Sequence, residues 1–271
     1  KHRYAPPSSR LNTTISSLSP EPTDRTSLLE RSAITTTPKT VFVATERLGD
    51  EPYRLFVNQR TELTRHLRVM VLTDPKPRRG RSLPTVVAEC LDAGATAIQL
   101  RDKDATAREI VAQAKELAKL TAAADALLII NDRFDLAIAA GTSAVHLGPE
   151  DLPVAAVRRI APKGFVIGYS TDDPEEAQKN ISDGADYLGV GAVYGTTSKS
   201  GLADEAIGPN GVASVMDSVN SPCVGIGGIT PDNAKPVLQT GAGIAVLSAV
   251  MGAPNPGAIV REFVSMSEGG T

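Results

Sequence analysis

A chain of 271 residues is long enough for one large domain with an extension, or for two small domains. Hydrophobic residues make up 41% of it and charged residues 22%, which is typical of a chain with a packed core. The net charge of −3 argues against nucleic acid or an anionic membrane surface as a partner, and no apolar run reaches the ~18 residues of a membrane span. Cys90 and Cys223 form no CxxC or zinc pattern, which suits a reducing compartment.

Residues 1–39 are crowded with Ser, Thr and Pro, and residues 1–20 contain no acidic side chain. One interpretation is the remnant of an organellar targeting segment, which is basic, Ser-rich and poor in acids. The other is a disordered or irregular tail. No amphipathic helix is evident there, which favours the tail. We therefore expect an N-terminal extension over residues 1–60, a separate domain over residues 61–271, and a cytoplasmic rather than organellar protein.

After about Arg68, short apolar runs alternate with helical patterns, which indicates βα units and a parallel sheet. The near-continuous apolar character of these runs is typical of strands that are covered on both faces. Eight strands are predicted, at residues 69–74, 97–102, 127–132, 144–148, 166–170, 187–193, 223–227 and 244–250. Residues 106–120 carry the clearest helical stripe, and Ser82 and Asp173 are expected to cap the helices after strands one and five.

Eight βα units in roughly 200 residues match the size of a compact TIM barrel. A doubly wound open sheet is the alternative, but it would show a GxGxxG turn after its first strand, where this chain has LTDPKPRRG. We therefore predict a (β/α)₈ TIM barrel. In such a barrel the chemistry takes place at the carboxyl ends of the strands.

The motifs GIGG (225–228) and VLSAV (246–250) follow each other at strands seven and eight. In many barrels the loops after these strands bind phosphate through backbone N–H groups, and glycine lets the backbone approach the ligand closely. The pair therefore predicts a phosphate site. Tight packing of the barrel is the other explanation for these glycines.

In QLRDK (99–103), alternation along a strand sends Gln99, Arg101 and Lys103 to the same side. Arg101 and Lys103 at a strand end could bind a diphosphate. A surface ion cluster with Asp102 and Asp104 is the alternative.

Two acidic residues follow neighbouring strands, Asp132 in NDR (131–133) and Asp151 in HLGPED (146–151). Mg²⁺ is commonly bound by one or two carboxylates together with substrate phosphate oxygens, so this pair is a candidate Mg²⁺ site. Asp151 could instead cap the following helix. His146, within a buried strand, is expected to be structural.

The segment VYGTTSKSG (193–201) opens a loop that is long for a βα connection, which suggests a lid. Thr196, Ser198 and Lys199 offer two hydroxyls and an ammonium group to an anion. A solvated loop with exposed polar side chains is the alternative.

Taken in order, these motifs resemble those of the thiamine-phosphate synthase family: QLRDK, IINDR, HLGPED, GYS, GAVYGTTSK, GIGGIT and VLSAV. The resemblance runs from about Arg68 to Met251. It implies a Mg²⁺-dependent transferase that joins 4-amino-5-hydroxymethyl-2-methylpyrimidine diphosphate to 4-methyl-5-(2-phosphoethyl)thiazole. The products would be thiamine phosphate and pyrophosphate. Whether the protein forms a homo-oligomer is left open by the sequence.

The resemblance also implies residue roles. The residues assigned to the diphosphate are basic or carry an amide: Arg101, Lys103, Asn131 and Lys199. The basic members of that set would act in catalysis by stabilising the departing diphosphate. Asp132 and Asp151 would bind Mg²⁺, while Gln99 and Ser170 would contact the pyrimidine and leaving-group region. The residues assigned to the thiazole phosphate supply hydroxyl or backbone N–H groups: Thr196, Ser198, Gly228, Leu247 and Ser248.

The chain departs from this pattern after Ser170, where many bacterial members have Ala-His-Thr and this chain has Thr171, Asp172 and Asp173. The related thiazole tautomerase, an isomerase on the same barrel, uses a histidine just after that serine, so Asp172 argues against this relative. A non-catalytic, phosphate-sensing barrel is an alternative of another class.

Overall fold

The computed structural model describes residues 60–75, 80–195 and 206–268. Eight parallel strands form a closed barrel in sequence order, and β8 pairs with β1. The strands are β1 Val69–Leu72, β2 Ala97–Leu100, β3 Leu127–Asn131, β4 Ala144–Leu147, β5 Val166–Ser170, β6 Tyr187–Val190, β7 Cys223–Ile226 and β8 Gly243–Val246. The predicted (β/α)₈ barrel is confirmed.

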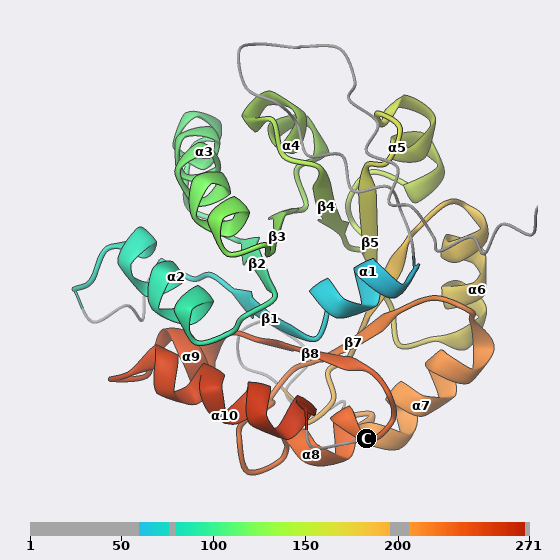
Figure 1. Ribbon diagram of the computed structural model, residues 1–271. Coiled ribbons are helices and arrows are strands. Elements are labelled where there is room, and N and C mark those ends of the chain that lie inside the picture. Colours follow the sequence, from blue (N-terminus) through green and yellow to red (C-terminus); the bar gives the residue numbers. More distant parts are fainter. Residues whose placement is uncertain (1–59, 76–79, 196–205, 269–271) are drawn as a thin grey trace, which may run out of the picture. The chain divides into compact units, whose positions relative to one another are not determined.

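Helices surround the strands (Figure 1). Their bounds are α1 Arg60–His66, α2 Leu83–Asp92, α3 Ala107–Ala123, α4 Phe134–Ala140, α5 Val154–Ile160, α6 Pro174–Ser182, α7 Gly208–Ser218, α8 Ala234–Leu238, α9 Ser248–Met251 and α10 Pro256–Glu268. Within the described ranges, no helix has the length and apolar character needed to cross a membrane.

Seven of the eight predicted strands extend past the observed strand end, and two of them do so by three residues or more. The strand predicted at 244–250 ends at Val246, and Ser248–Met251 form a helical turn. The strand predicted at 187–193 ends at Val190. In both places the apolar run continues past the strand, and a short buried helix or loop gives the same apolar pattern as a strand.

The helix starts follow local side-chain chemistry. Ser82 Oγ accepts a hydrogen bond from the Thr85 amide at 3.2 Å, and Asp173 Oδ1 accepts one from the Glu176 amide at 2.7 Å. Both predicted N-caps are therefore confirmed. Thr106 and Glu109 form a capping box at the start of α3, which is longer at its carboxyl end than the predicted helix.

Alternation along the strands divides the apolar residues into two layers. Val69 and Val71 of β1 pack toward the surrounding helices, while Met70 and Leu72 fill the barrel interior. Leu63 and Leu67 of α1 join the interior cluster from the amino-terminal end of the strands, and Figure 1 shows α1 lying across the ring. The opposite mouth, at the carboxyl ends, is where the loops with polar residues gather.

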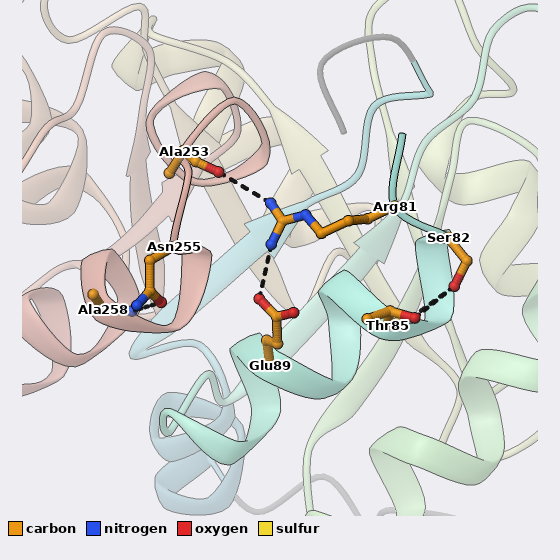
Figure 2. A network of polar contacts seen from close by, with 7 residues as sticks. All are labelled: Arg81, Ser82, Thr85, Glu89, Ala253, Asn255 and Ala258. Atoms are coloured by element: carbon orange, nitrogen blue, oxygen red, sulfur yellow. Dashed lines mark hydrogen bonds and ion pairs between the residues drawn. The ribbon is translucent and has the colours of Figure 1, made fainter. Parts of the chain in front are cut away.

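Arg81 connects the first βα unit to the last one. Its guanidinium donates to Glu89 Oε2 of α2 at 2.9 Å and to the carbonyl oxygen of Ala253 at 3.0 Å (Figure 2). Ala253 lies between α9 and α10, so this side chain joins the two ends of the barrel. Asn255 caps α10 in the same region by accepting from the Ala258 amide at 2.9 Å.

We predict that Arg81→Ala lowers the free energy of unfolding by about 1 kcal/mol, because a half-buried arginine loses a hydrogen bond to a carbonyl as well as an ion pair. Lys179→Ala removes a surface ion pair between α6 and its C-cap residue Asp183, and should cost less than about 0.5 kcal/mol. Urea denaturation of both variants checks this. Equal losses would show that the contact with Ala253 contributes nothing.

Candidate active site

The carboxyl ends of β2, β3 and β4 gather the predicted charged residues. These strands are neighbours in the barrel, so Lys103 after β2, Asp132 after β3 and Asp151 after β4 lie on adjacent loops. Lys103 Nζ is 3.8 Å from Asp132 Oδ2. Asp102, on the same loop as Lys103, accepts hydrogen bonds from the backbone amides of Asp104 and Ala105. The alternative of a surface ion cluster with Asp102 and Asp104 stays a prediction.

Asp132 has a left-handed backbone, with φ of 61°. This conformation is uncommon outside glycine, although Asp and Asn tolerate it better than most residues. Its amide donates to the carbonyl oxygen of His146 on β4 at 2.8 Å. The turn at the end of β3 is thereby tied to the strand that leads to Asp151.

The pKa of Asp132 is raised above the ordinary value of an aspartate. Partial burial is the largest cause, and the nearby Asp151 carboxylate is the next. Lys103 and Arg101 act in the opposite direction. The position of Asp151 is set by its Oδ2, which accepts a hydrogen bond from the Gly148 amide at 2.6 Å. It does not cap α5, whose N-cap is Pro153.

The Asp132 carboxylate, whose pKa is raised in part by the neighbouring Asp151, is a suitable place for a divalent cation, which would relieve the repulsion. The described residues contain no group of three His, Cys, Asp or Glu side chains placed to hold a metal. Mg²⁺ does not need such a group, because substrate phosphate oxygens and water complete its shell. The Asp132–Asp151 pair therefore fits Mg²⁺ bound together with a diphosphate.

A second feature lies at β7 and β8, which are neighbouring strands. Gly227 and Gly228 both have positive φ, at 104° and 64°, and follow β7 directly. A Cβ at Gly228 would lie 2.4 Å from the carbonyl oxygen of Gly195, so this turn requires glycine. Leu247 and Ser248 begin α9 after β8, and the first N–H groups of a helix have no partner within it. The predicted phosphate site therefore has suitable backbone groups.

Asn233 holds this glycine turn and was not predicted. Its side-chain oxygen accepts from the Thr230 amide at 2.7 Å, and its side-chain nitrogen donates to the Gly228 carbonyl oxygen at 3.0 Å. Its own carbonyl oxygen accepts from the Tyr194 hydroxyl at 2.8 Å. The sequence signal was available, since an Asn close after GIGGIT suits a side-chain-stabilised turn.

Thr73 is the other residue that sequence reasoning missed. Its hydroxyl donates to the Arg101 carbonyl oxygen at 3.0 Å and accepts from the Arg101 amide at 2.9 Å. It is almost fully buried. Both bonds fix the backbone of a predicted diphosphate-binding residue, and no local pattern in the sequence indicates them.

Three further predicted residues lie at or inside the same mouth. Asn131 ends β3 and Ser170 ends β5, both half-buried. Gln99 is only 2% exposed inside the barrel, where its amide contacts Met70 Sδ at 3.6 Å. The roles assigned to these three residues stay predictions.

Thr196, Ser198 and Lys199 lie outside the described residues, so the predicted lid and their contacts with anions stay predictions as well.

Fold and site together define a (β/α)₈-barrel enzyme with charged residues on one side of its mouth and a glycine turn on the other. A sequence profile described as thiamine monophosphate synthase matches residues 69–250. The chain belongs to the thiamine monophosphate synthase family.

Similar proteins agree with this assignment. A thiamine-phosphate synthase of Natronomonas pharaonis is 42% identical over 209 residues, which cover 76% of this chain and 98% of the relative. The solved structure of a thiamine phosphate pyrophosphorylase from Pyrococcus furiosus is 42% identical and has a TM-score of 0.69, over 76% of this chain and 98% of the other. A 3-hexulose-6-phosphate synthase from Salmonella typhimurium, at 17% identity and a TM-score of 0.59 over 75% of this chain and 100% of the other, shares the fold alone.

We predict that Asp132→Asn removes the stabilisation that Mg²⁺ with pyrophosphate gives the protein. In the metal-free protein the raised pKa means that ionised Asp132 destabilises the fold, a penalty that grows as pH rises from the ordinary aspartate pKa to the raised one. At neutral pH the metal-free variant should therefore melt at the same temperature or higher, and Asn also tolerates the left-handed backbone.

Thermal melting with and without Mg²⁺ and pyrophosphate tests this. Asp135→Asn is the control, because Asp135 is exposed and pairs with Arg133. The control should keep the ligand-induced rise in melting temperature. A full rise in Asp132→Asn would remove Asp132 from the cation site.

The glycine turn yields a second prediction. Asn233→Ala should raise the KM for a substrate with a phosphate monoester about tenfold, on the scale of ~1.4 kcal/mol, because Gly228 loses the side chain that holds it. Asn255→Ala also removes an asparagine-to-backbone hydrogen bond, but at the start of α10. It should lower stability while leaving KM unchanged. Steady-state kinetics of both variants decide, and equal KM values would contradict the role of Asn233.

Proposed function

We propose that this chain is a Mg²⁺-dependent thiamine-phosphate synthase, which joins the pyrimidine diphosphate to the thiazole phosphate. The observation that carries the proposal is the pairing, at one barrel mouth, of two chemically different sites. The charged residues after β2, β3 and β4 suit a diphosphate, and the glycine turn and helix start after β7 and β8 suit a phosphate monoester. The family's two substrates carry these two groups.

The reaction exchanges one bond for another. The bond between the pyrimidine methylene carbon and the diphosphate oxygen breaks, and the electron pair leaves with the diphosphate. The lone pair of the thiazole ring nitrogen forms the new bond to that carbon. No proton has to be removed from the nucleophile, so the site needs groups that stabilise negative charge on the leaving group more than it needs a general base.

The residues of the β2–β4 side would do this. Arg101 offers a planar set of donors to two phosphate oxygens, and Lys103 offers a single positive charge. Mg²⁺ bound by Asp132 and Asp151 would supply further charge neutralisation for the departing diphosphate. Asn131 would add an amide donor. Gly228, Leu247 and Ser248 would hold the thiazole phosphate on the other side, which fixes the two reactants relative to each other.

Two rivals make different demands on this site. A thiazole tautomerase moves a proton within one substrate, and at the position where that relative has its histidine this chain has the exposed Asp172. A phosphate-sensing barrel would need the glycine turn but not the charged residues after β2, β3 and β4. The raised pKa of Asp132 beside Asp151 favours a site built for a cation.

Incubation with both substrates and Mg²⁺, followed by mass detection of thiamine phosphate and pyrophosphate, tests the proposal. Isomerised thiazole without pyrophosphate would indicate the tautomerase, and binding without turnover would indicate the sensor.

We predict that Arg101→Gln lowers kcat/KM about a hundredfold, the scale of losing one preorganised charge stabiliser. Arg133→Gln is the control, because this exposed arginine pairs with Asp135 and should leave kcat/KM unchanged.

A further inference from the structure

A row of three side chains connects the barrel interior to its mouth. The Tyr187 hydroxyl of β6 is 2.9 Å from Nδ1 of His146 on β4, and Nε2 of His146 is 2.8 Å from Oγ of Ser170 on β5. Tyr187 is fully buried and His146 is 8% exposed. Ser170 is half-buried at the end of its strand. The row therefore ends in a hydroxyl at the mouth.

The barrel is built to hold this row. A Cβ at Gly168 would lie 2.2 Å from Tyr187 Cζ and 2.4 Å from His146 Nδ1. A Cβ at Gly189 would lie 2.9 Å from His146 Cε1. Both positions pair with the strands that carry the row, and any larger residue there would displace the tyrosine or the histidine.

The direction of the hydrogen bonds follows from Tyr187. Burial raises the pKa of its hydroxyl, which therefore keeps its proton. Among the described residues, His146 Nδ1 is the one hydrogen-bond partner of this hydroxyl. A buried donor without an acceptor costs about 1–3 kcal/mol, so the tyrosine donates to Nδ1. A neutral imidazole that accepts at Nδ1 carries its proton on Nε2.

We propose that Tyr187 and His146 act as positioning residues that make the Ser170 hydroxyl a hydrogen-bond donor toward the substrate. Since Nε2–H donates to Ser170 Oγ, the serine proton does not point at the histidine and can be donated into the mouth. The substrate atom that meets Ser170 must then carry a lone pair, as a ring nitrogen or a diphosphate oxygen does. The same polarity prevents Ser170 from acting as a nucleophile, because His146 cannot take up its proton.

This inference rests on the proposed function for the identity of the substrate, but the tautomer can be measured without turnover. In protein labelled with ¹⁵N-histidine, the ring nitrogens of the three histidines report which atom carries the proton. The spectrum of His146→Gln assigns the signals of His146. We expect Nε2 protonated and Nδ1 unprotonated in the wild type, and a mixture of both tautomers in Tyr187→Phe. A wild-type protein with the proton on Nδ1 would overturn the inference.

Single-turnover rates test the link to the substrate. Ser170→Ala and Tyr187→Phe should each slow the reaction about tenfold, and the double variant should be no slower than Ser170→Ala, because both changes remove the same donor. His146→Gln, which keeps an N–H for Ser170, should retain more activity than His146→Leu. Tyr169→Phe is the matched control: it removes a hydroxyl that donates to Glu176 on the outer side of β5 and should react at the wild-type rate.

The outcomes separate the two proposals. Full activity in Tyr187→Phe beside an impaired Ser170→Ala would overturn the role of the row. Full activity in Ser170→Ala would overturn the contact between its hydroxyl and the substrate. If no thiamine phosphate forms with any protein while the histidine tautomer is as expected, the proposed function fails and the assigned direction of the hydrogen bonds is supported.

Discussion

The closed ring of parallel strands is the constraint on which the rest of this structure depends. Because all strands run in the same direction, every carboxyl end opens on one mouth, and residues as far apart in sequence as Arg101, Asp132 and Ser170 all lie at that mouth. Because side chains alternate, every second residue must fit inside the ring. Sequence positions that look independent are therefore coupled through the barrel.

This coupling is clearest where the interior becomes polar. A fully buried tyrosine and a buried histidine can be accommodated inside the barrel because each satisfies the other, and because Gly168 and Gly189 leave the room they occupy. His146 also contacts Ser170, a residue at the mouth. One hydrogen-bonded row thus connects the packing of the core to a residue that is proposed to contact the substrate.

The two sides of the mouth are supported in the same way. Thr73 holds the Arg101 backbone, the Gly148 amide fixes Asp151, and Asn233 holds the glycine turn. No ligand was assigned to Thr73, Gly148 or Asn233 from the sequence. Each of them nevertheless fixes the position of a residue that was expected to bind one: Arg101, Asp151 and Gly228, respectively. A charge stabiliser is most effective when it does not have to move during the reaction, and such supporting contacts provide that order.

The sequence alone determined the eight βα units, the helix caps at Ser82 and Asp173, and the polar motifs that follow the strands, because these features depend on residues near one another in the chain. It could not determine where β8 ends and α9 begins, since an apolar run looks the same in a buried strand and a short buried helix. It also could not show the left-handed backbone of Asp132 or the partners of His146 and Thr73. Those depend on neighbours supplied by other strands, and only the closed barrel brings them into contact.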